Sequence, residues 1–188
     1  MACTAITRGR TLNCNRISGG ISAVYFAVLD QITSITYDST ASPNGVREIE
    51  DIDMDTNSIY KYALPLGTSS LTDTIVGSRE NGTIYYTPTI NIIYNKLSKE
   101  DQQEIKLLAA TKTVVFAELN QQLANGHNVI VAMGMVNGME LNAGTMDSGA
   151  AWGDRNGYTL TFDGMESQPF AMVQDYTTTP FDNIDSGG

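Results

Sequence analysis

A long alternating segment in the middle of the chain places the strongest limit on its fold. From Gly82 to Leu97 the sequence reads GTIYYTPTINIIYNKL, and threonines alternate with Ile and Tyr over much of its length. A period of two is typical of a β-strand with one buried face. A strand of about 15 residues, at about 3.3 Å each, extends nearly 50 Å, whereas most strands have about 5–6 residues. Such a strand favours a sheet that neighbouring molecules complete. Pro88 lacks an amide donor and predicts an edge, a bulge or a break within it.

The segment after this strand has the signals of a helix. Ser98 is a good N-cap, and acidic residues follow it where the helix dipole favours them. Gly126 is suited to the left-handed conformation that ends many helices. Apolar residues at helical spacing supply a buried face: Ile105, Leu108, Val115 and Leu119, with Phe116 and Leu123 beside them. These signals predict an amphipathic helix over about residues 98–125.

Short strands are predicted on both sides of this central region. Residues 21–29 are apolar on both faces and residues 32–37 are β-branched, so the two segments can form a hairpin. Residues 69–76 are a further candidate strand. Asn137-Gly138 predicts a tight turn, and therefore a hairpin, within residues 128–141. The segment from Gly149 to Val173 predicts the closing strands.

The length of the chain, 188 residues, predicts one domain over residues 1–188. The polar N-terminal segment 1–18 has no periodicity and is predicted to be an arm. Residues 38–62 are turn-rich and then acidic, which predicts a long excursion from the core. The polar residues 174–188 predict a tail that is loose or ordered only by partners. The predicted fold class is mainly β, a sandwich or partial barrel with one flanking helix.

The net charge of −10 argues against a protein that grips nucleic-acid phosphates, because gripping them requires Lys and Arg. The charge is also uneven. Eight acids follow from Glu140 onward against the single base Arg155, whereas the first 16 residues carry three arginines and no acid. The two ends can therefore be complementary between subunits. The alternative is that the acidic balance only maintains solubility.

The sequence lacks the motifs of common catalytic sites, and no cofactor is predicted. It has no Gly-x-Ser-x-Gly elbow, no phosphate-binding Gly-rich loop and no His-Glu-x-x-His helix. His127 is the only histidine, which leaves little room for acid–base catalysis or a zinc site with Cys3 and Cys14. The two cysteines are expected to be free thiols in a reducing compartment, with a disulfide as the alternative. The chain is therefore predicted not to be an enzyme.

One acidic stretch resembles the start of a calcium-binding loop. Asp51, Asp53 and Asp55 alternate, but Thr56 stands where the EF-hand turn needs Gly and Tyr62 where it needs Glu. A non-standard cation site remains one interpretation of this stretch. The other is a solvated acidic edge that discourages unwanted strand pairing, and no metal ligand is predicted.

Two features favour contacts with other subunits. Trp152 lies in a Gly- and Ala-rich loop, where a lone Trp is more typical of an anchor or a subunit contact than of a ligand site. The N-terminal arm and the 38–62 excursion cannot build a core by themselves. The candidate contact residues are Arg8, Arg10, Arg47, Glu48, Asp51, Asp53 and Trp152.

No apolar run approaches the ~18 residues that span a bilayer, so no membrane anchor is predicted. The first residues have no apolar core of the kind a signal peptide has. The protein is therefore expected to be made and kept in a cytoplasm unless it leaves as part of a particle.

The second half of the chain resembles the major tail tube proteins of tailed bacteriophages. The resemblance covers residues 82–173, about half of the chain, and is one of pattern and order. Its most specific element has the pattern Gly-Ala-x-x-Gly-Asp-x-Asn-Gly-Tyr-x-Leu-x-Phe. The matching residues are Gly149, Ala150, Gly153, Asp154, Asn156, Gly157, Tyr158, Leu160 and Phe162, followed by Gly164, Glu166 and Pro169.

The resemblance implies a β-sandwich whose strands are completed into a shared barrel by a ring of copies. It implies hexameric rings that stack into a tube, other tail proteins as partners, DNA that passes through without specific binding, and a place in the virion after assembly in the host cytoplasm. An acidic lumen would repel phosphates and let DNA slide. The alternative function is a carbohydrate- or surface-binding β-sandwich module, with Trp152 and nearby tyrosines as its platform.

Overall fold

The computed structural model describes residue 10, residues 17–38 and residues 48–187. The elements in chain order are β1 Ile21–Val28, the short 3-10 helix η1 Leu29–Gln31, β2 Ser34–Tyr37, β3 Glu48–Asp53, β4 Ile59–Ala63, β5 Ser70–Ser78, β6 Thr83–Asn95, α1 Lys99–Leu108, β7 Thr113–Gln122, β8 Asn128–Met133, β9 Glu140–Asp147, β10 Gly157–Asp163, β11 Ala171–Val173 and β12 Ile184–Asp185. The protein is mainly β with one α-helix in this part of the chain, which confirms the predicted class.

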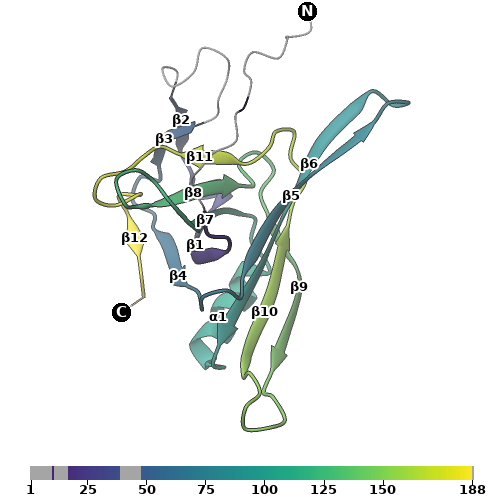
Figure 1. Cartoon of the computed structure of the whole chain (residues 1–188), viewed down its shortest axis with the longest axis vertical. Coiled ribbons are helices and arrows are strands. Elements are labelled where there is room, and N and C mark those ends of the chain that lie inside the picture. Colours follow the sequence, from purple (N-terminus) through teal and green to yellow (C-terminus); the bar gives the residue numbers. More distant parts are fainter. Residues whose placement is uncertain (1–9, 11–16, 39–47, 188) are drawn as a thin grey trace, which may run out of the picture.

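The strands form two open sheets (Figure 1). The larger sheet has eight strands in the order β12-β4-β1-β7-β8-β11-β3-β2, and the smaller has four in the order β5-β6-β10-β9. All neighbours in the four-stranded sheet are antiparallel. The β5–β6 hairpin extends past the other strands at one end of that sheet, and the β9–β10 loop lies at its opposite end (Figure 1).

The main core lies between the two sheets. Phe26 of β1 and Phe162 of β10 meet there with ring centroids 5.0 Å apart. Val115 of β7 and Ile90 and Ile92 of β6 belong to the same cluster, and all are fully buried. Face-to-face packing of this kind removes one side of each sheet from water and supplies the dominant stabilising free energy.

A second core covers the other face of the eight-stranded sheet. Its lid is the C-terminal segment, residues 174–187, whose Phe181 is buried against Tyr25 and Phe116 at centroid distances of 5.3 and 4.8 Å. Strand β12 then pairs in parallel with β4. The prediction of a loose tail is therefore wrong for these residues, because the eight-stranded sheet has two apolar faces and needs cover on both.

The predicted helix is less than half as long as expected. Ser98 is the N-cap, and its side chain accepts a hydrogen bond from the Asp101 amide at 3.0 Å, as predicted. The helix α1 ends at Leu108, and the prediction of helix from residue 109 to residue 125 is wrong because β7 occupies most of that segment. Strand β7 lies between β1 and β8 with Val114, Val115 and Phe116 buried on both of its faces. A β-branched run buried on both sides is stable as a central strand, and this tertiary burial outweighs the helical spacing.

None of the described helices has the length and apolar character to cross a membrane.

Two predicted hairpins are also wrong. Strand β1 pairs with β4 and β7, while β2 pairs with β3, so residues 21–37 do not form a hairpin. Strands β8 and β9 belong to different sheets, and Asn137-Gly138 lies in the connection between them. Gly138 has a positive φ of 82°, but Asn137 does not, so the pair does not form the tight turn that its sequence predicts. The partner of each strand, and with it the path of this connection, depends on the packing of both sheets.

The predicted excursion over residues 38–62 contains two strands. Residues 39–47 lie outside the described part, but β3 pairs with β2 and β11, and β4 pairs with β1. The segment is therefore built into the eight-stranded sheet, and the prediction of an excursion from the core is wrong for its described residues. Ile49 and Ile59, both fully buried, explain this outcome.

The long strand is confirmed as β6, which covers 13 residues. Pro88 lies within it at the point where the β10 ladder ends, because the last β10 pair is Asp163 with Thr89. The Pro88 carbonyl accepts a hydrogen bond from the Gly164 amide at 3.1 Å, so its amide position faces the end of β10 and not β5. The missing donor thus lies where the ladder stops.

The inter-sheet core gives a first testable prediction. Replacing Phe162→Ala opens a cavity against Phe26, and we expect the free energy of unfolding to fall by about 3–5 kcal/mol. The matched control is Thr161→Ala, because Thr161 is the adjacent residue on the opposite face of β10 and donates only an exposed hydrogen bond, to Asn91 Oδ1 at 2.7 Å, whose loss should cost about 1 kcal/mol. Urea denaturation followed by circular dichroism measures both, and equal effects would contradict a core between the sheets.

Candidate assembly surfaces

The four-stranded sheet has two unpaired edges in the described part of the chain. Strands β5 and β9 are its end strands, each paired on one side only. The bonds that continue the β6–β10 ladder, from Gly164 N–H to Pro88 and from Lys96 N–H to Asn156, fix which residues bond across it. Backbone hydrogen bonds between β6 and β10 therefore join even-numbered residues of the two strands. Successive residues of a strand direct their backbone groups to opposite sides, so the odd-numbered residues of β10 bond to β9.

This parity identifies the free backbone groups of β9. Its residues opposite Thr159 and Thr161 are Thr145 and Ala143, whose amides face β10. The amides of Gly144 and Met146 therefore face outward at the sheet edge. Free edges of this kind are templates for pairing with another chain unless something covers them.

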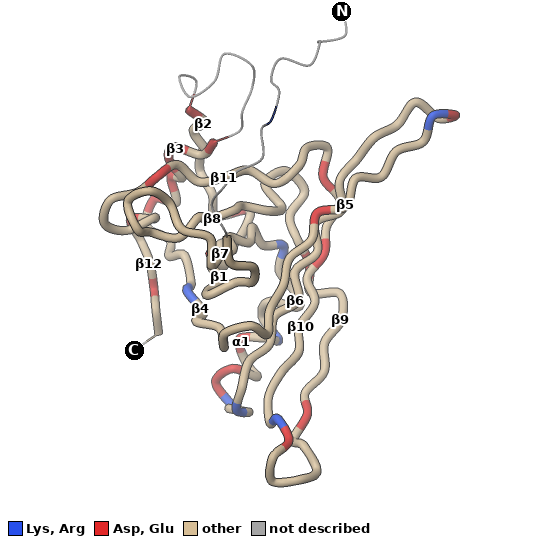
Figure 2. The backbone as a smooth tube through the Cα atoms, viewed as in Figure 1, with Lys and Arg blue, Asp and Glu red and all other residues tan. Residues whose placement is uncertain are grey.

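The outward face of the four-stranded sheet is polar and rich in hydroxyl groups. Residues that alternate with the buried Leu160 and Phe162 point away from the core. The outward residues of the four strands include Ser70, Thr72, Thr74, Thr87, Thr89, Asn91, Thr145, Thr159 and Thr161. Figure 2 shows long stretches of this sheet without a charged residue. The face therefore offers hydroxyl and amide groups with little fixed charge.

Two bases near the middle and base of this sheet, Arg155 and Lys112, are engaged by neighbouring groups, while Arg79 and Lys96 lie at the ends of its strands. Arg155 donates hydrogen bonds to the Tyr158 carbonyl at 3.1 Å and to Thr159 Oγ1 at 2.7 Å. Lys112, at the start of β7, pairs with Glu140 at 3.4 Å. Asp163 accepts a hydrogen bond from Asn142 at 2.7 Å. Few basic groups are thus available on this face to hold phosphates.

The predicted contact residues do not form one site. Arg8 and Arg47 lie outside the described residues, and Arg10 is exposed. Glu48, Asp51 and Asp53 lie on β3 in the eight-stranded sheet, whereas Trp152 lies in the β9–β10 loop at one end of the other sheet. The structure therefore assigns these residues to at least two separate surfaces.

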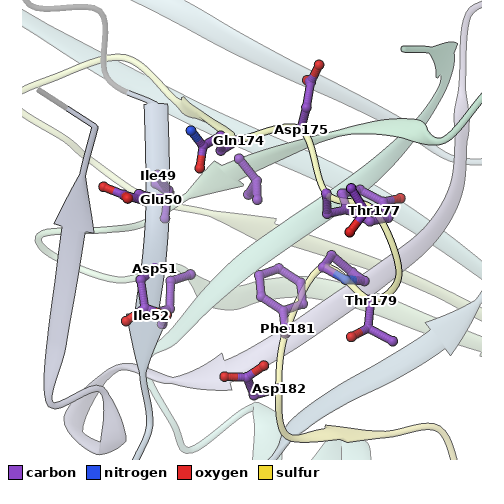
Figure 3. Close-up of a pocket in the computed structure, with 13 residues that line it drawn as sticks. Ile49, Glu50, Asp51, Ile52, Gln174, Asp175, Thr177, Thr179, Phe181 and Asp182 are labelled. Atoms are coloured by element: carbon purple, nitrogen blue, oxygen red, sulfur yellow. The ribbon is translucent and has the colours of Figure 1, made fainter. Parts of the chain in front are cut away.

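A cavity of about 290 Å³ lies beside β3, under the segment that follows β11. Figure 3 shows side chains of β3 on one side of it and of the C-terminal segment on the other. Four acids line it: Glu50, Asp51, Asp175 and Asp182. No group of three or more His, Cys, Asp or Glu side chains in the described residues is arranged to hold a metal ion. The aspartate stretch instead shapes a turn, because Asp53 Oδ1 accepts the Asp55 amide at 2.9 Å.

Glu118 of β7 is the centre of a polar cluster in the eight-stranded sheet. It accepts hydrogen bonds from Tyr25 Oη and Asn128 Nδ2, both at 2.8 Å, and lies 3.6 Å from Lys61 Nζ. Burial alone would raise the pKa of Glu118, but the bonds from Asn128 and Tyr25 and the Lys61 charge lower it overall. Burial and then Glu118 raise the pKa of Tyr25. Neither group is poised to exchange protons near neutrality, so the cluster serves to join strands β1, β4, β7 and β8.

Trp152 is fully exposed at the end of a loop that is held by its own hydrogen bonds. Asp154 Oδ2 accepts the amides of Ala150 at 3.0 Å and Ala151 at 2.7 Å, and Asp147 Oδ1 accepts the Gly149 amide at 2.9 Å. The loop is therefore ordered although the indole is bare. A large apolar side chain presented in this way is typical of a contact with another molecule.

The distal part of the β5–β6 hairpin, residues 75–86, forms a projecting arm, which is distinct from the N-terminal arm. Ile75 and Ile84 are 65% and 63% exposed on one of its faces. The alternation of Ile75 and Val76, and of Ile84 and Tyr85, gives the arm apolar residues on both faces. The apolar residues on both sides of the turn at residues 79–82 are the sequence signal for this surface.

Comparisons with protein-family models, with curated proteins and with solved structures found no match to this chain.

The Trp152 loop gives a second testable prediction. The amides of Ala151 and then Ala150 hold the pKa of the Asp154 carboxyl below its ordinary value of 3.8. A lowered pKa means that the carboxylate supports the loop fully above pH 3.8 and that this support is lost as the pH falls through the lower folded value. We expect Asp154→Ala to speed hydrogen exchange at both amides at pH 6. Asp182→Ala, a substitution at an acid outside the loop, is the control, and unchanged exchange in Asp154→Ala would contradict the assignment.

Proposed function

We propose that this chain is a structural subunit of a tail tube of the kind found in tailed bacteriophages. Copies pair their four-stranded sheets edge to edge in a ring, with six copies as in the family that the sequence resembles, and rings stack into a tube that conducts DNA. In this proposal the protein is not an enzyme, assembles in the host cytoplasm with other tail proteins, and is part of the virion.

The observation that carries the proposal is the open four-stranded sheet. Its end strands β5 and β9 have unpaired outer edges in the described residues, which would invite uncontrolled association in an isolated molecule. Closure into a shared barrel satisfies the outer backbone groups of both strands and removes the edges. The core side of the sheet is already covered by the eight-stranded sheet, so its outward face would line the lumen.

The character of that outward face supports the same function. DNA that must slide without sticking requires a surface with few free cations, because phosphate neutralisation by Lys and Arg dominates DNA affinity. The face presents mostly Thr and Asn side chains, and Arg155 is occupied by Tyr158 and Thr159. The net charge of −10 adds a general repulsion of phosphates.

The predicted contact residues enter the proposal as a second, outer set of contacts. Arg8 and Arg10 of the N-terminal arm would meet acids such as Glu48, Asp51 and Asp53 of a neighbouring copy. Asp51 and Asp53 are on β3 near the rim of the eight-stranded sheet, where they are accessible. Exposed charge pairs would add mainly orientation and speed of association, with little affinity.

The alternative is a carbohydrate- or surface-binding module centred on Trp152, whose full exposure favours it. A sugar platform usually needs more than one accessible aromatic ring. Tyr158, the nearest tyrosine in sequence, is buried in the core, and no ring contact of Trp152 occurs among the described residues. A glycan array that gives Trp152-dependent binding would favour this alternative.

Edge pairing can be tested with one proline. The Met146 amide faces the free edge of β9, so Met146→Pro removes an outer donor and leaves the β9–β10 ladder intact. We expect this variant to stay a folded monomer, while the matched control Met146→Ala, which keeps the amide, forms rings and tubes. Negative-stain microscopy and analytical ultracentrifugation measure the outcome. Normal tubes from Met146→Pro would contradict pairing through β9, and a wild-type chain that never assembles would contradict the function.

The lumen assignment can be tested with one charge. Asn91 is exposed on the outward face of β6, the second strand of the four-stranded sheet. We expect Asn91→Lys tubes to retain DNA that is protected from nuclease, with affinity that falls steeply with salt, because each copy adds a cation inside the tube. Asn91→Gln is the neutral control and should retain no more DNA than wild type. DNA held by the lysine variant but fully open to nuclease would place this face outside the tube.

A further inference from the structure

Two apolar surfaces that no described residue covers lie at opposite ends of the four-stranded sheet. One is the bare indole of Trp152 in the β9–β10 loop, and the other is the Ile75–Ile84 face of the arm (Figure 1). We propose that Trp152 of one copy packs onto the arm of the next copy along the tube axis. This inference rests on the proposed function and adds the contact that stacks one ring on another.

The strand register provides a seat for the indole on the arm. Ile75 is opposite Tyr86, and Gly77 is opposite Ile84, so all four positions lie on the same face of the hairpin. Because Gly77 has no side chain, the position beside Ile84 is empty. Apart from the carbonyl oxygen of Thr83, at 3.8 Å, no neighbouring heavy atom lies within 4 Å of the place where a Gly77 Cβ would be. A flat ring can therefore lie over Gly77 with Ile75 and Ile84 at its sides.

The arm needs such a cover more than the rest of the sheet does. The last β10 pair is Asp163 with Thr89, and beyond it Tyr86 forms a single bridge with Glu166. The outer part of the arm is then a two-stranded hairpin, which is marginal in water without an apolar face packed on something. Burial of Ile75 and Ile84 by a second molecule would stabilise it.

The partner is another copy, because the Trp152 loop offers a protruding apolar ring and the arm offers an apolar face with room for a ring. The two surfaces lie at opposite ends of one sheet, so they cannot meet within a molecule. They also cannot meet between neighbouring copies in one ring, because the Trp152 loops of all copies lie at one end of the ring and the arms lie at the other. A contact between different surfaces of identical copies does not close on itself and generates a stack.

The size of the contact explains why single copies would not stack. A Trp side chain buries about 150–250 Å², whereas a stable specific interface needs about 1,000 Å² or more in total. One Trp–arm contact is therefore too weak alone. A ring presents one such contact for each of its copies, and the contacts reinforce one another because they form together. Stacking is thus expected only after ring closure.

The test compares stacking with ring formation in the full chain. Trp152→Ala should leave rings intact and raise the critical concentration for tube growth at least tenfold, since truncation of a central Trp commonly costs more than a factor of ten per contact. Leu66→Ser is the control, because Leu66 is another strongly exposed apolar residue, 81% exposed, and lies in the β4–β5 connection. It should stack as wild type does.

A substitution at Gly77 separates a shaped seat from general stickiness. Gly77→Val fills the position beside Ile84, and its backbone is not in the positive-φ region that disfavours side chains. Valine raises the β-propensity and the apolar area of the arm. We nevertheless expect Gly77→Val to block stacking and leave rings intact, because the valine occupies the place of the indole. If the arm only adhered to any apolar surface, the added apolar area would make stacking stronger.

Crosslinking then identifies the neighbours. In a Cys3→Ser, Cys14→Ser background, Ala151→Cys rings are mixed with tagged Arg79→Cys rings and treated with a short bis-maleimide. A crosslinked heterodimer is expected, and Leu66→Cys in place of Arg79→Cys should give none. Wild-type-like tubes from Trp152→Ala, or stronger stacking by Gly77→Val, would overturn the contact while the tube function stands. A wild-type chain that forms no rings at all would overturn both.

Discussion

The packing of the four-stranded sheet onto the eight-stranded sheet is the interaction on which the rest of this protein depends. Phe26 and Phe162 meet between the sheets, and Ile90, Ile92 and Val115 are fully buried around them. Because this contact uses one face of the small sheet, the other face and both edges are left to water or to neighbours. The surfaces that can assemble are therefore a direct consequence of where the core lies.

The eight-stranded sheet has a different role because both of its faces are covered. The small sheet covers one face, and the C-terminal segment with Phe181 covers the other. The Glu118 cluster ties four of its strands together through satisfied hydrogen bonds. A sheet held in this way is a rigid support, and it lets the small sheet keep open edges and an uncovered arm without losing the fold.

Parts of the fold could be read from local patterns and parts could not. The long strand β6 and the Ser98 cap were predicted because alternation and capping act within a few residues. Strand β7 was predicted as helix because Ile105, Leu108, Val115 and Leu119 have helical spacing, and nothing local reports that Val114 and Phe116 are buried on the opposite face. Strand partners were missed for the same reason, since β1 pairs with strands distant in sequence. Trp152 was predicted to be a loop anchor or a subunit contact; its full exposure shows that the indole does not anchor its own loop, and the subunit contact stays a prediction. The apolar face of the arm was overlooked because exposure depends on where β10 ends.

The sequence by itself determined the class of the protein, its acidic charge, the long alternating strand and the Ser98 helix cap, because composition, alternation and capping are properties of short segments. Only the tertiary structure decided which strands are neighbours, which face of each is buried, and which edges and apolar side chains remain without a partner. Those features depend on contacts between residues far apart in the chain, and each such contact is favourable only when the whole core has formed.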